Sequence, residues 1–213
     1  MKRHLVPARE ALQRLVEGNR RFVEELRAGG ASSNRARRVA LATGQAPFAV
    51  ILGCSDSRVP VEIVFDQGLG DLFVIRVAGN IVAPSQIGSV EFAAERFGTR
   101  LVVVLGHSKC GAIGATIDEL LRPAENQSRN LRSIVDLIRP SVEDLLHSEL
   151  RHDPVALSRE AVRANIRASV DHLRHGSDVL EEAIRAYGLR VVGAEYSLDS
   201  GYVEFLDPIQ VDQ

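Results

Sequence analysis

An uninterrupted aliphatic run at residues 101–105, Leu-Val-Val-Val-Leu, restricts the fold more than any other feature. A strand that is apolar at every position is covered on both faces, as the central strands of parallel sheets are. Further apolar runs of strand length span residues 48–53, 71–77 and 189–196, and helical segments separate the runs. Because strands that alternate with helices form parallel sheets, the sequence predicts an α/β fold with a mostly parallel central sheet flanked by helices.

The two ends of the chain depart from this alternation. Pro7 and an apolar stripe at helical spacing predict a helix over residues 7–27, and a glycine-rich loop follows it. Residues 1–34 are therefore expected to form an N-terminal helical arm with its loop. At the other end, the turn residues 198–201 predict a hairpin whose last strand, residues 202–206, is an antiparallel edge strand of the sheet.

The region 127–187 is expected to be helical with three breaks. One break is expected at Pro140, because proline removes a backbone donor from a helix. The other two are expected where new helices begin, after Asp153 and after Ser177. Both residues suit the N-cap position, because their side-chain oxygens can accept hydrogen bonds from the first free backbone N–H groups.

Composition excludes several classes of protein. The chain has 213 residues, 45% of them hydrophobic, and no linker or repeat interrupts it, so residues 1–213 are expected to form a single domain. A net charge of −2 argues against a nucleic-acid partner. No apolar run approaches the ~20 residues of a membrane helix, and charged residues interrupt the start of the chain where a signal peptide would be apolar. We therefore expect a cytoplasmic protein with no nucleic-acid or membrane partner.

Both cysteines lie beside the ends of predicted strands. Cys54 directly follows the run 48–53, and His107 directly follows the run 101–106, with Cys110 at the start of the next expected helix. In an open α/β sheet, ligands bind outside the carboxyl ends of strands, so these three side chains converge if the two strands are neighbours. Two thiolates and one imidazole are typical of a catalytic Zn²⁺ site with one open position, and we predict one Zn²⁺ per chain.

Three alternatives to a catalytic zinc site stay open at this point. A lone buried cysteine usually acts as a small hydrophobic residue. A disulfide between Cys54 and Cys110 is a second alternative, although cysteines in a reducing cytosol are more often metal ligands or catalytic groups. A structural zinc is the third; it would be closed by a fourth protein ligand, and Asp56 is near enough in sequence to be that ligand.

Asp56 and Arg58 lie two residues apart on the loop that begins at Cys54. The planar fork of an arginine pairs bidentately with a carboxylate, which would keep Asp56 ionised and oriented. Beside a zinc-bound hydroxide, such a carboxylate accepts the hydrogen bond of the hydroxide and orients it for attack. The alternative is an ordinary loop salt bridge, worth ~0–1 kcal/mol if exposed. We predict the catalytic role because the pair adjoins a predicted metal site.

Together these residues resemble the signature of the β-class carbonic anhydrases, Cys-x-Asp-x-Arg followed at a distance by His-x-x-Cys. The signature stands here at residues 54–58 and 107–110, and the segment Asp-Leu-Phe-Val-Ile-Arg-Val-Ala-Gly-Asn at residues 71–80 also matches. The resemblance implies reversible hydration of carbon dioxide to bicarbonate and a proton. It further implies that Zn²⁺ is bound by Cys54, His107 and Cys110, and that Asp56 and Arg58 form the catalytic dyad.

The resemblance also implies how substrate is bound and how chains assemble. Gln45 stands where many members have a glutamine that hydrogen-bonds substrate, and Phe73 where a pocket phenylalanine is expected. Gly111 follows the second cysteine, and its backbone N–H could face the pocket. The alternatives are purely structural roles: Gln45 would be a turn residue and Phe73 a core residue. Family members are homodimers or multiples of dimers, whose N-terminal helices embrace the partner and whose pockets can take residues from both chains.

Two departures from the family pattern bear on function. The chain has no Trp, and Ile51 occupies the place of a tryptophan in the regulatory bicarbonate pocket of some bacterial members. Phe92 stands where plant-like relatives carry a pocket tyrosine. Two other functions stay open: hydrolysis of a related heterocumulene, such as carbon disulfide or carbonyl sulfide, and a non-catalytic zinc-binding role on the same fold.

Overall fold

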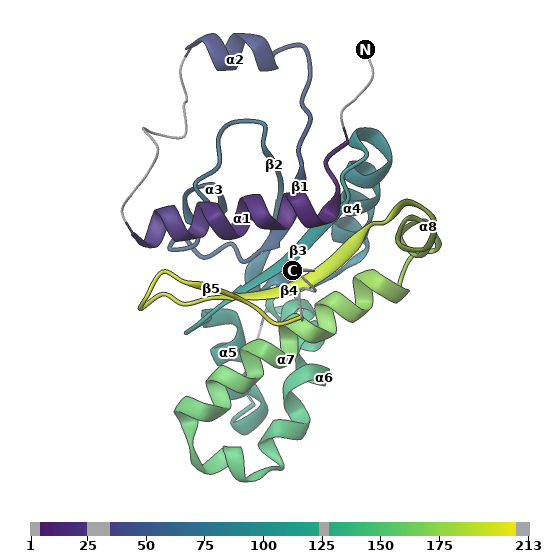
Figure 1. Ribbon diagram of the computed structural model, residues 1–213. Coiled ribbons are helices and arrows are strands. Elements are labelled where there is room, and N and C mark those ends of the chain that lie inside the picture. Colours follow the sequence, from purple (N-terminus) through teal and green to yellow (C-terminus); the bar gives the residue numbers. More distant parts are fainter. Residues whose placement is uncertain (1–4, 25–34, 124–127, 208–213) are drawn as a thin grey trace.

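A five-stranded sheet in the order β2–β1–β3–β4–β5 forms the centre of the computed structural model (Figure 1), which describes residues 5–24, 35–123 and 128–207. Strands β2, β1, β3 and β4 are parallel, and β5 is antiparallel to β4 at the edge. The predicted α/β fold with a mostly parallel sheet is confirmed. The strands are β1 (Ala49–Gly53), β2 (Leu72–Arg76), β3 (Leu101–His107), β4 (Arg190–Tyr196) and β5 (Val203–Phe205).

Helices cover both faces of the sheet, and every residue of β1 and β3 is therefore buried. One face packs against helices α4 to α8, and the other packs against α1 and the short α3. Figure 1 shows α6 and α7 side by side below the sheet. The helices are α1 (Ala8–Val23), α2 (Arg35–Leu41), α3 (Val61–Val64), α4 (Pro84–Phe97), α5 (Gly111–Leu121), α6 (Arg129–Leu146), α7 (Pro154–His175) and α8 (Asp178–Tyr187), with short 3₁₀ turns at η1 (Ala78–Asn80) and η2 (Glu149–His152).

The helical region confirms two of its predicted boundaries and corrects the third. Asp153 accepts hydrogen bonds from two backbone N–H groups at the start of α7, and Ser177 accepts one at the start of α8, so both are N-caps. The predicted break at Pro140 is wrong, because α6 continues through it. Buried Val135, Ile138 and Val142 lie on both sides of Pro140. Burying three such side chains is worth ~1.5–3 kcal/mol each, which exceeds the ~3 kcal/mol that an interior proline costs.

The termini agree with the predicted arm and hairpin where the structure describes them. The first helix ends at Val23, and residues 25–27 of the predicted helix, like the loop that follows, lie outside the described residues. The β4–β5 hairpin turns at Gly201, whose φ of 78° favours glycine. Among the described helices, none combines the length and apolarity that crossing a bilayer requires.

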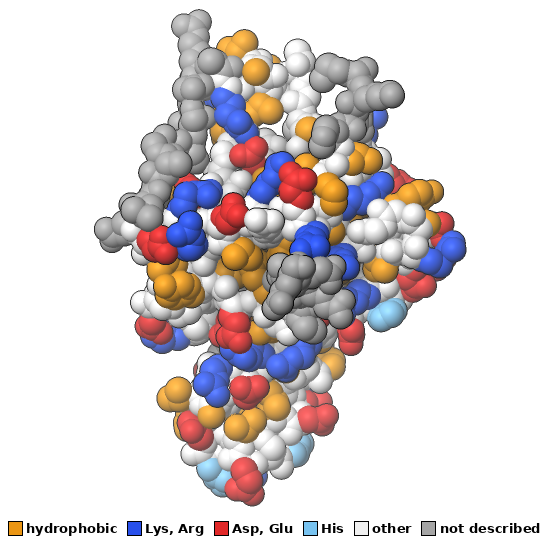
Figure 2. Space-filling view, viewed as in Figure 1, with side chains coloured by type: hydrophobic (Ala, Val, Ile, Leu, Met, Phe, Trp, Pro, Cys, Tyr) orange, Lys and Arg blue, Asp and Glu red, His pale blue; other side chains and the backbone are white. Residues whose placement is uncertain are grey.

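The exposed side of α1 carries charges of both signs. Glu10 and Arg14 form an ion pair, as do Arg20 and Glu24, and each pair is spaced four residues apart. Figure 2 shows acidic and basic side chains interspersed over this face of the molecule. The buried side of α1 belongs to the core, so the helix is amphipathic as its sequence predicts.

Asn19 fastens α1 to the body of the molecule. Its Nδ2 donates to Val64 O at 3.0 Å and to Gly201 O at 2.9 Å, and its Oδ1 accepts from Val203 N at 2.9 Å. Asn19 is 4% exposed. One side chain thereby joins α1 to α3 and to the β4–β5 hairpin. The preceding Gly18 permits this approach, because a Cβ there would lie 1.8 Å from a backbone oxygen.

Asn19→Ala is expected to lower the free energy of unfolding by about 3 kcal/mol, because it leaves backbone groups without partners where water reaches them poorly. Urea unfolding at a fixed protein concentration measures the change. Gln13→Ala, which removes an exposed hydrogen bond on the same helix, is the control and should change the free energy by less than ~0.5 kcal/mol. Equal effects of the two substitutions would contradict the role assigned to Asn19.

Candidate metal centre

Strand pairing brings the three predicted ligands together. Strands β1 and β3 are neighbours, with Gly53 opposite Leu105, so Cys54 lies beside the end of β3. His107 is the last residue of β3 itself, and Cys110 is the N-cap of α5. The ligand atoms of Cys54, His107 and Cys110 all lie within 4.8 Å of one another, and the two sulfurs are 4.0 Å apart. The predicted convergence of these side chains is therefore observed.

The orientation of His107 suits a metal ligand. Its Nδ1 lies 2.9 Å from Ser108 O, to which it can only donate, so the neutral ring presents Nε2 as an acceptor. His107 is fully buried, and among the described residues Nε2 has no hydrogen-bond partner. A buried acceptor without a partner is costly in a folded protein. A cation bound between the imidazole and the sulfurs would supply the missing partner.

The two sulfurs have opposite proton affinities. The hydrogen bond from the Cys110 thiol lowers the pKa of Cys54 to about 4 against the effect of burial, and the Gly79 N–H contributes to the lowering. The thiolate of Cys54, together with burial, raises the pKa of Cys110 well above its usual value. At 4.0 Å, either sulfur can donate its proton to the other. A divalent cation that displaces it fits this donor set, and two thiolates with one neutral imidazole are a zinc combination.

Asp56 is held by Arg58 in the bidentate geometry that the sequence predicts. Arg58 Nε donates to Asp56 Oδ1 at 2.9 Å, and Arg58 Nη2 donates to Oδ2 at 2.7 Å. The backbone N–H of Arg58 also donates to Oδ1, at 2.9 Å. These hydrogen bonds hold the pKa of Asp56 well below its usual range. Asp56 Oδ2 lies 3.8 Å from His107 Nε2, so the ionised carboxylate adjoins the ligand cluster.

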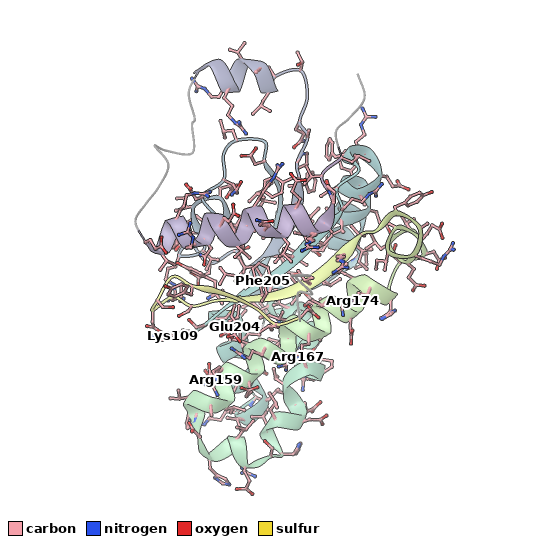
Figure 3. The ribbon with its side chains drawn as sticks, viewed as in Figure 1. Lys109, Arg159, Arg167, Arg174, Glu204 and Phe205 are labelled. Carbon is pink, nitrogen blue, oxygen red and sulfur yellow. The ribbon has the colours of Figure 1, made fainter. Side chains whose placement is uncertain are left out.

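The β4–β5 hairpin holds the segment that carries His107 and Cys110. Ser108 donates its backbone N–H to Tyr196 O at 3.0 Å and accepts from Leu198 N through its hydroxyl, also at 3.0 Å. Lys109 Nζ pairs with Asp199 at 2.6 Å, and Figure 3 shows Lys109 at the hairpin end of the sheet. These contacts fix the short turn from β3 into α5.

Arg76 contributes to the site and was not predicted from the sequence. Its Nε donates to Cys54 O at 3.0 Å, and its Nη2 donates to Asp56 O at 2.6 Å. Arg76 is the last residue of β2 and lies opposite Gly53 in register. The sequence feature that could have indicated this role is a charged residue at the carboxyl end of an apolar strand. That end of β2 lies beside the end of β1, where the loop with Cys54 begins. The guanidinium braces the backbone of that loop.

The predicted substrate-binding residues lie in different places. Gly111 follows Cys110 directly, and open space surrounds the position where its Cβ would stand. Gln45 is exposed and lies a few residues before the start of β1 at Ala49. It is therefore at the opposite end of that strand from Cys54. Phe73 lies opposite Val50 in the first half of β1. Within one chain, only Gly111 adjoins the metal ligands.

Phe73 belongs to an aromatic cluster. Its ring centroid lies 6.2 Å from that of Phe92 and 5.9 Å from that of Phe97. Phe92 is half exposed, so the cluster reaches the surface. Ile51, in contrast, is fully buried in the core beneath α1. The substrate-binding roles of Gln45, Phe73 and Gly111 stay predictions.

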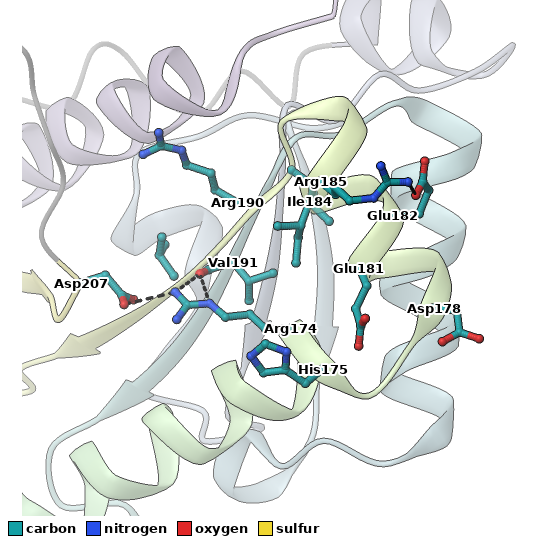
Figure 4. A pocket seen from close by; sticks show the side chains of 12 residues that line it. Arg174, His175, Asp178, Glu181, Glu182, Ile184, Arg185, Arg190, Val191 and Asp207 are labelled. Carbon is teal, nitrogen blue, oxygen red and sulfur yellow. Dashed lines mark hydrogen bonds and ion pairs between the residues drawn. The ribbon is translucent and has the colours of Figure 1, made fainter.

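A separate pocket of about 750 Å³ lies between the end of α7, helix α8 and the start of β4 (Figure 4). Strand β4 runs parallel to β3, so the start of β4 lies at the amino-terminal ends of the strands, whereas the candidate metal ligands lie at the carboxyl ends. Two of the arginines that line this pocket are paired: Arg174 with Asp207, and Arg185 with Glu182. This pocket is therefore separate from the candidate metal centre.

Comparisons with known proteins agree with this geometry. A family model described as carbonic anhydrase matches residues 49–203. The chain is 39% identical to "Carbonic anhydrase 2" of Mycobacterium tuberculosis over 93% of each chain, and 38% identical to a carbonic anhydrase of Mycolicibacterium smegmatis over 91% of each. Among solved structures, the β-carbonic anhydrase CcaA is similar with a TM-score of 0.73, at 28% identity over 94% of this chain and 93% of that one. The β-carbonic anhydrase CafA of Aspergillus fumigatus is similar with a TM-score of 0.71, at 27% identity over 86% of each. The chain belongs to the β-class carbonic anhydrase family.

Proposed function

We propose that the protein uses one Zn²⁺ per chain, held by Cys54, His107 and Cys110, to hydrate carbon dioxide reversibly to bicarbonate and a proton. The observation that carries the proposal is the convergence of three buried ligand atoms within 4.8 Å, beside a carboxylate that Arg58 holds ionised. Family membership supports the same reaction. When bound, the zinc supplies a Lewis acid that makes water nucleophilic near neutral pH.

The three ligands determine the net charge of the metal centre, and the orientation of His107 determines where the cation would lie. Two thiolates neutralise the two charges of the cation, and the neutral His107 adds none. Ser108 O fixes the tautomer of His107, which keeps Nε2 directed at the sulfurs. Against the larger effects of the Cys54 thiolate and of burial, which raise the pKa of Cys110, the backbone N–H groups of Ile113 and Ala112 at the start of α5 lower it. These features support a preformed site whose ligands need little rearrangement.

Asp56 orients the attacking oxygen. Arg58 occupies both carboxylate oxygens from one side, so Asp56 stays ionised and can only accept hydrogen bonds. Its Oδ2 lies 3.8 Å from His107 Nε2, so a carboxylate acceptor adjoins the ligand cluster. A carboxylate paired in this way does not need the metal as a partner. The Asp56–Arg58 pair therefore supports an open fourth position rather than a zinc closed by Asp56.

Substrate binding is proposed to require a second copy of the chain. Gln45 and the aromatic cluster of Phe73, Phe92 and Phe97 lie on the side of the sheet where β1 begins, away from the ligands of their own chain. The exposed ring of Phe92 makes part of that surface apolar. In a homodimer, or a multiple of dimers, this surface would complete the partner's pocket with an amide donor and apolar walls for carbon dioxide.

Parallel assays of the zinc-loaded protein distinguish the candidate functions. Stopped-flow measurement of carbon dioxide hydration is compared with hydrolysis of carbonyl sulfide and of carbon disulfide. We expect rapid hydration and much slower turnover of the sulfur compounds. Preference for a sulfur compound would move the function to heterocumulene hydrolysis. Turnover of none of the three by a zinc-loaded chain would leave the non-catalytic zinc-binding role.

A further inference from the structure

A tight turn between β2 and α4 contacts the metal centre. Its Gly79 N–H donates to Cys54 Sγ at 3.3 Å in a buried position. Gly79 and Asn80 both have positive φ, 69° and 43°, a conformation that glycine adopts freely but that is uncommon for a residue with a Cβ, such as Asn80. The turn also has no room for a larger residue, because a Cβ on Gly79 would lie 2.9 Å from Ile138 and 3.1 Å from Ala112. Such a conformation persists only where the surrounding structure holds it.

Helix α7 supplies that support. Asn165 Nδ2 donates to Gly79 O at 2.8 Å, and Ser169 Oγ donates to Asn80 O at 3.1 Å. Asn165 and Ser169 are four residues apart, so they lie on one face of the helix. They are 2% and 5% exposed. The Nδ2 donor of Asn80 does not brace the turn from within, because it has no hydrogen-bond partner among the described residues.

These two polar residues interrupt an otherwise apolar stripe. The buried face of α7 includes Val162, Ile166 and Val170, which pack into the core with the sheet. Burying an amide or a hydroxyl costs free energy unless the group is hydrogen-bonded, so an apolar residue is the default at such positions. Asn165 and Ser169 direct their donors at consecutive carbonyls of one turn. Their placement is therefore specific to that turn.

We propose that Asn165 and Ser169 are positioning residues for the metal centre. By holding the Gly79–Asn80 turn, they keep the Gly79 N–H directed at the Cys54 sulfur. The proposal rests on the proposed function, because it takes this sulfur to be a zinc ligand. Hydrogen bonds to the groups behind a metal ligand orient that ligand and tune the metal, and their loss typically lowers metal affinity by about 10–100-fold.

Asn165→Leu removes the donor and keeps the approximate size of the side chain. Its zinc affinity, measured by competition with a chromophoric chelator, should fall by about 10–100-fold. In the Co²⁺-loaded protein, the thiolate-to-cobalt charge-transfer absorption should shift, because the Cys54 sulfur loses a directed hydrogen bond. Leu173→Ala is the matched control: this residue is fully buried on the same helix and in the same core. It should lower thermal stability without changing zinc affinity or the cobalt absorption.

A second pair of variants isolates the hydroxyl. Ser169→Thr and Ser169→Val add side chains of nearly the same shape, so they disturb packing equally, and only threonine keeps the hydroxyl donor. The threonine variant should bind zinc about 2- to 10-fold more tightly than the valine variant, which is the value of one neutral hydrogen bond. This pair decides the question if Asn165→Leu fails to fold.

Unchanged zinc affinity and cobalt absorption in a folded Asn165→Leu protein would overturn the positioning role. Equal zinc affinities of the threonine and valine variants would also overturn it. A wild-type chain that binds neither Zn²⁺ nor Co²⁺ through its thiolates would instead overturn the proposed function, and the positioning role with it. The wild-type measurement thus separates failure of the inference from failure of the function.

Discussion

Cys110→Ser is expected to release most of the zinc and to abolish hydration of carbon dioxide. Serine keeps the shape of the side chain, but its hydroxyl is not ionised at neutral pH and cannot replace a thiolate 4.0 Å from the other sulfur. Binding of zinc to small protein sites is worth ~10–16 kcal/mol. Loss of one of three protein ligands should therefore cost about 3–5 kcal/mol, or about 150- to 4,000-fold in affinity.

Metal content after dialysis against a chelator, together with stopped-flow hydration, measures this effect. Ser57→Ala is the control, because Ser57 is an exposed hydroxyl on the loop between Asp56 and Arg58. The control should keep one zinc per chain and its activity. A Cys110→Ser protein that retains zinc at wild-type affinity would remove Cys110 from the ligand set.

Asp56→Asn is expected to keep zinc bound and to lower kcat/KM for hydration by about 10²–10⁴-fold, which is the usual contribution of a positioned proton-handling group. The amide cannot accept both hydrogen bonds of the Arg58 fork, because one oxygen becomes an NH₂ donor. The negative charge that orients the nucleophile is also lost. Retention of zinc, measured on the same sample, separates this effect from loss of the metal.

Asp199→Asn provides the matched control for Asp56→Asn. It makes the same carboxylate-to-amide change in another ion pair beside the ligand segment, with Lys109 at 2.6 Å. Both partners are exposed, so the pair is worth ~0–1 kcal/mol and hydration should change at most about fivefold. Near-normal hydration by Asp56→Asn would remove the dyad assignment. Simultaneous loss of zinc and activity in that variant would mean that Asp56 supports the metal rather than the reaction.

The convergence of the three candidate metal ligands was predictable because parallel strands end at the same edge of a sheet. Cys54 and His107 each stand at the end of an apolar run, and β1 and β3 are neighbours with Gly53 opposite Leu105. The prediction needed only the apolar runs and the topology rule. Its one inaccuracy is small: the β3 ladder continues through His107, opposite Tyr196, so this ligand is the last residue of the strand.

The contacts that brace the ligands could not be predicted in this way. Asn165 and Gly79 are 86 positions apart, and their hydrogen bond forms only after α7 packs on the sheet. A polar residue on a helix is assigned to solvent by default, because an amphipathic pattern describes a whole face and not one buried donor. Pro140 shows the same limit, since packing on both sides of it overrides its local preference to end a helix.

In the proposed dimer, Gln45 and Phe73 would serve the pocket of a second chain, whose place a sequence does not give. Their residue types suit a pocket that binds a small apolar molecule and releases bicarbonate. Their place at the other end of β1 separates them from the ligands of their own chain. The proposed substrate pocket is therefore the part of the site that could least be predicted from the sequence.

Hydration of carbon dioxide, followed by stopped flow while the metal-stripped protein is titrated with Zn²⁺, tests the central claim most directly. We predict that the hydration rate rises in proportion to the zinc added and stops rising at one Zn²⁺ per chain. Hydration that is absent at every zinc level, or that is equally fast without zinc, would contradict the account.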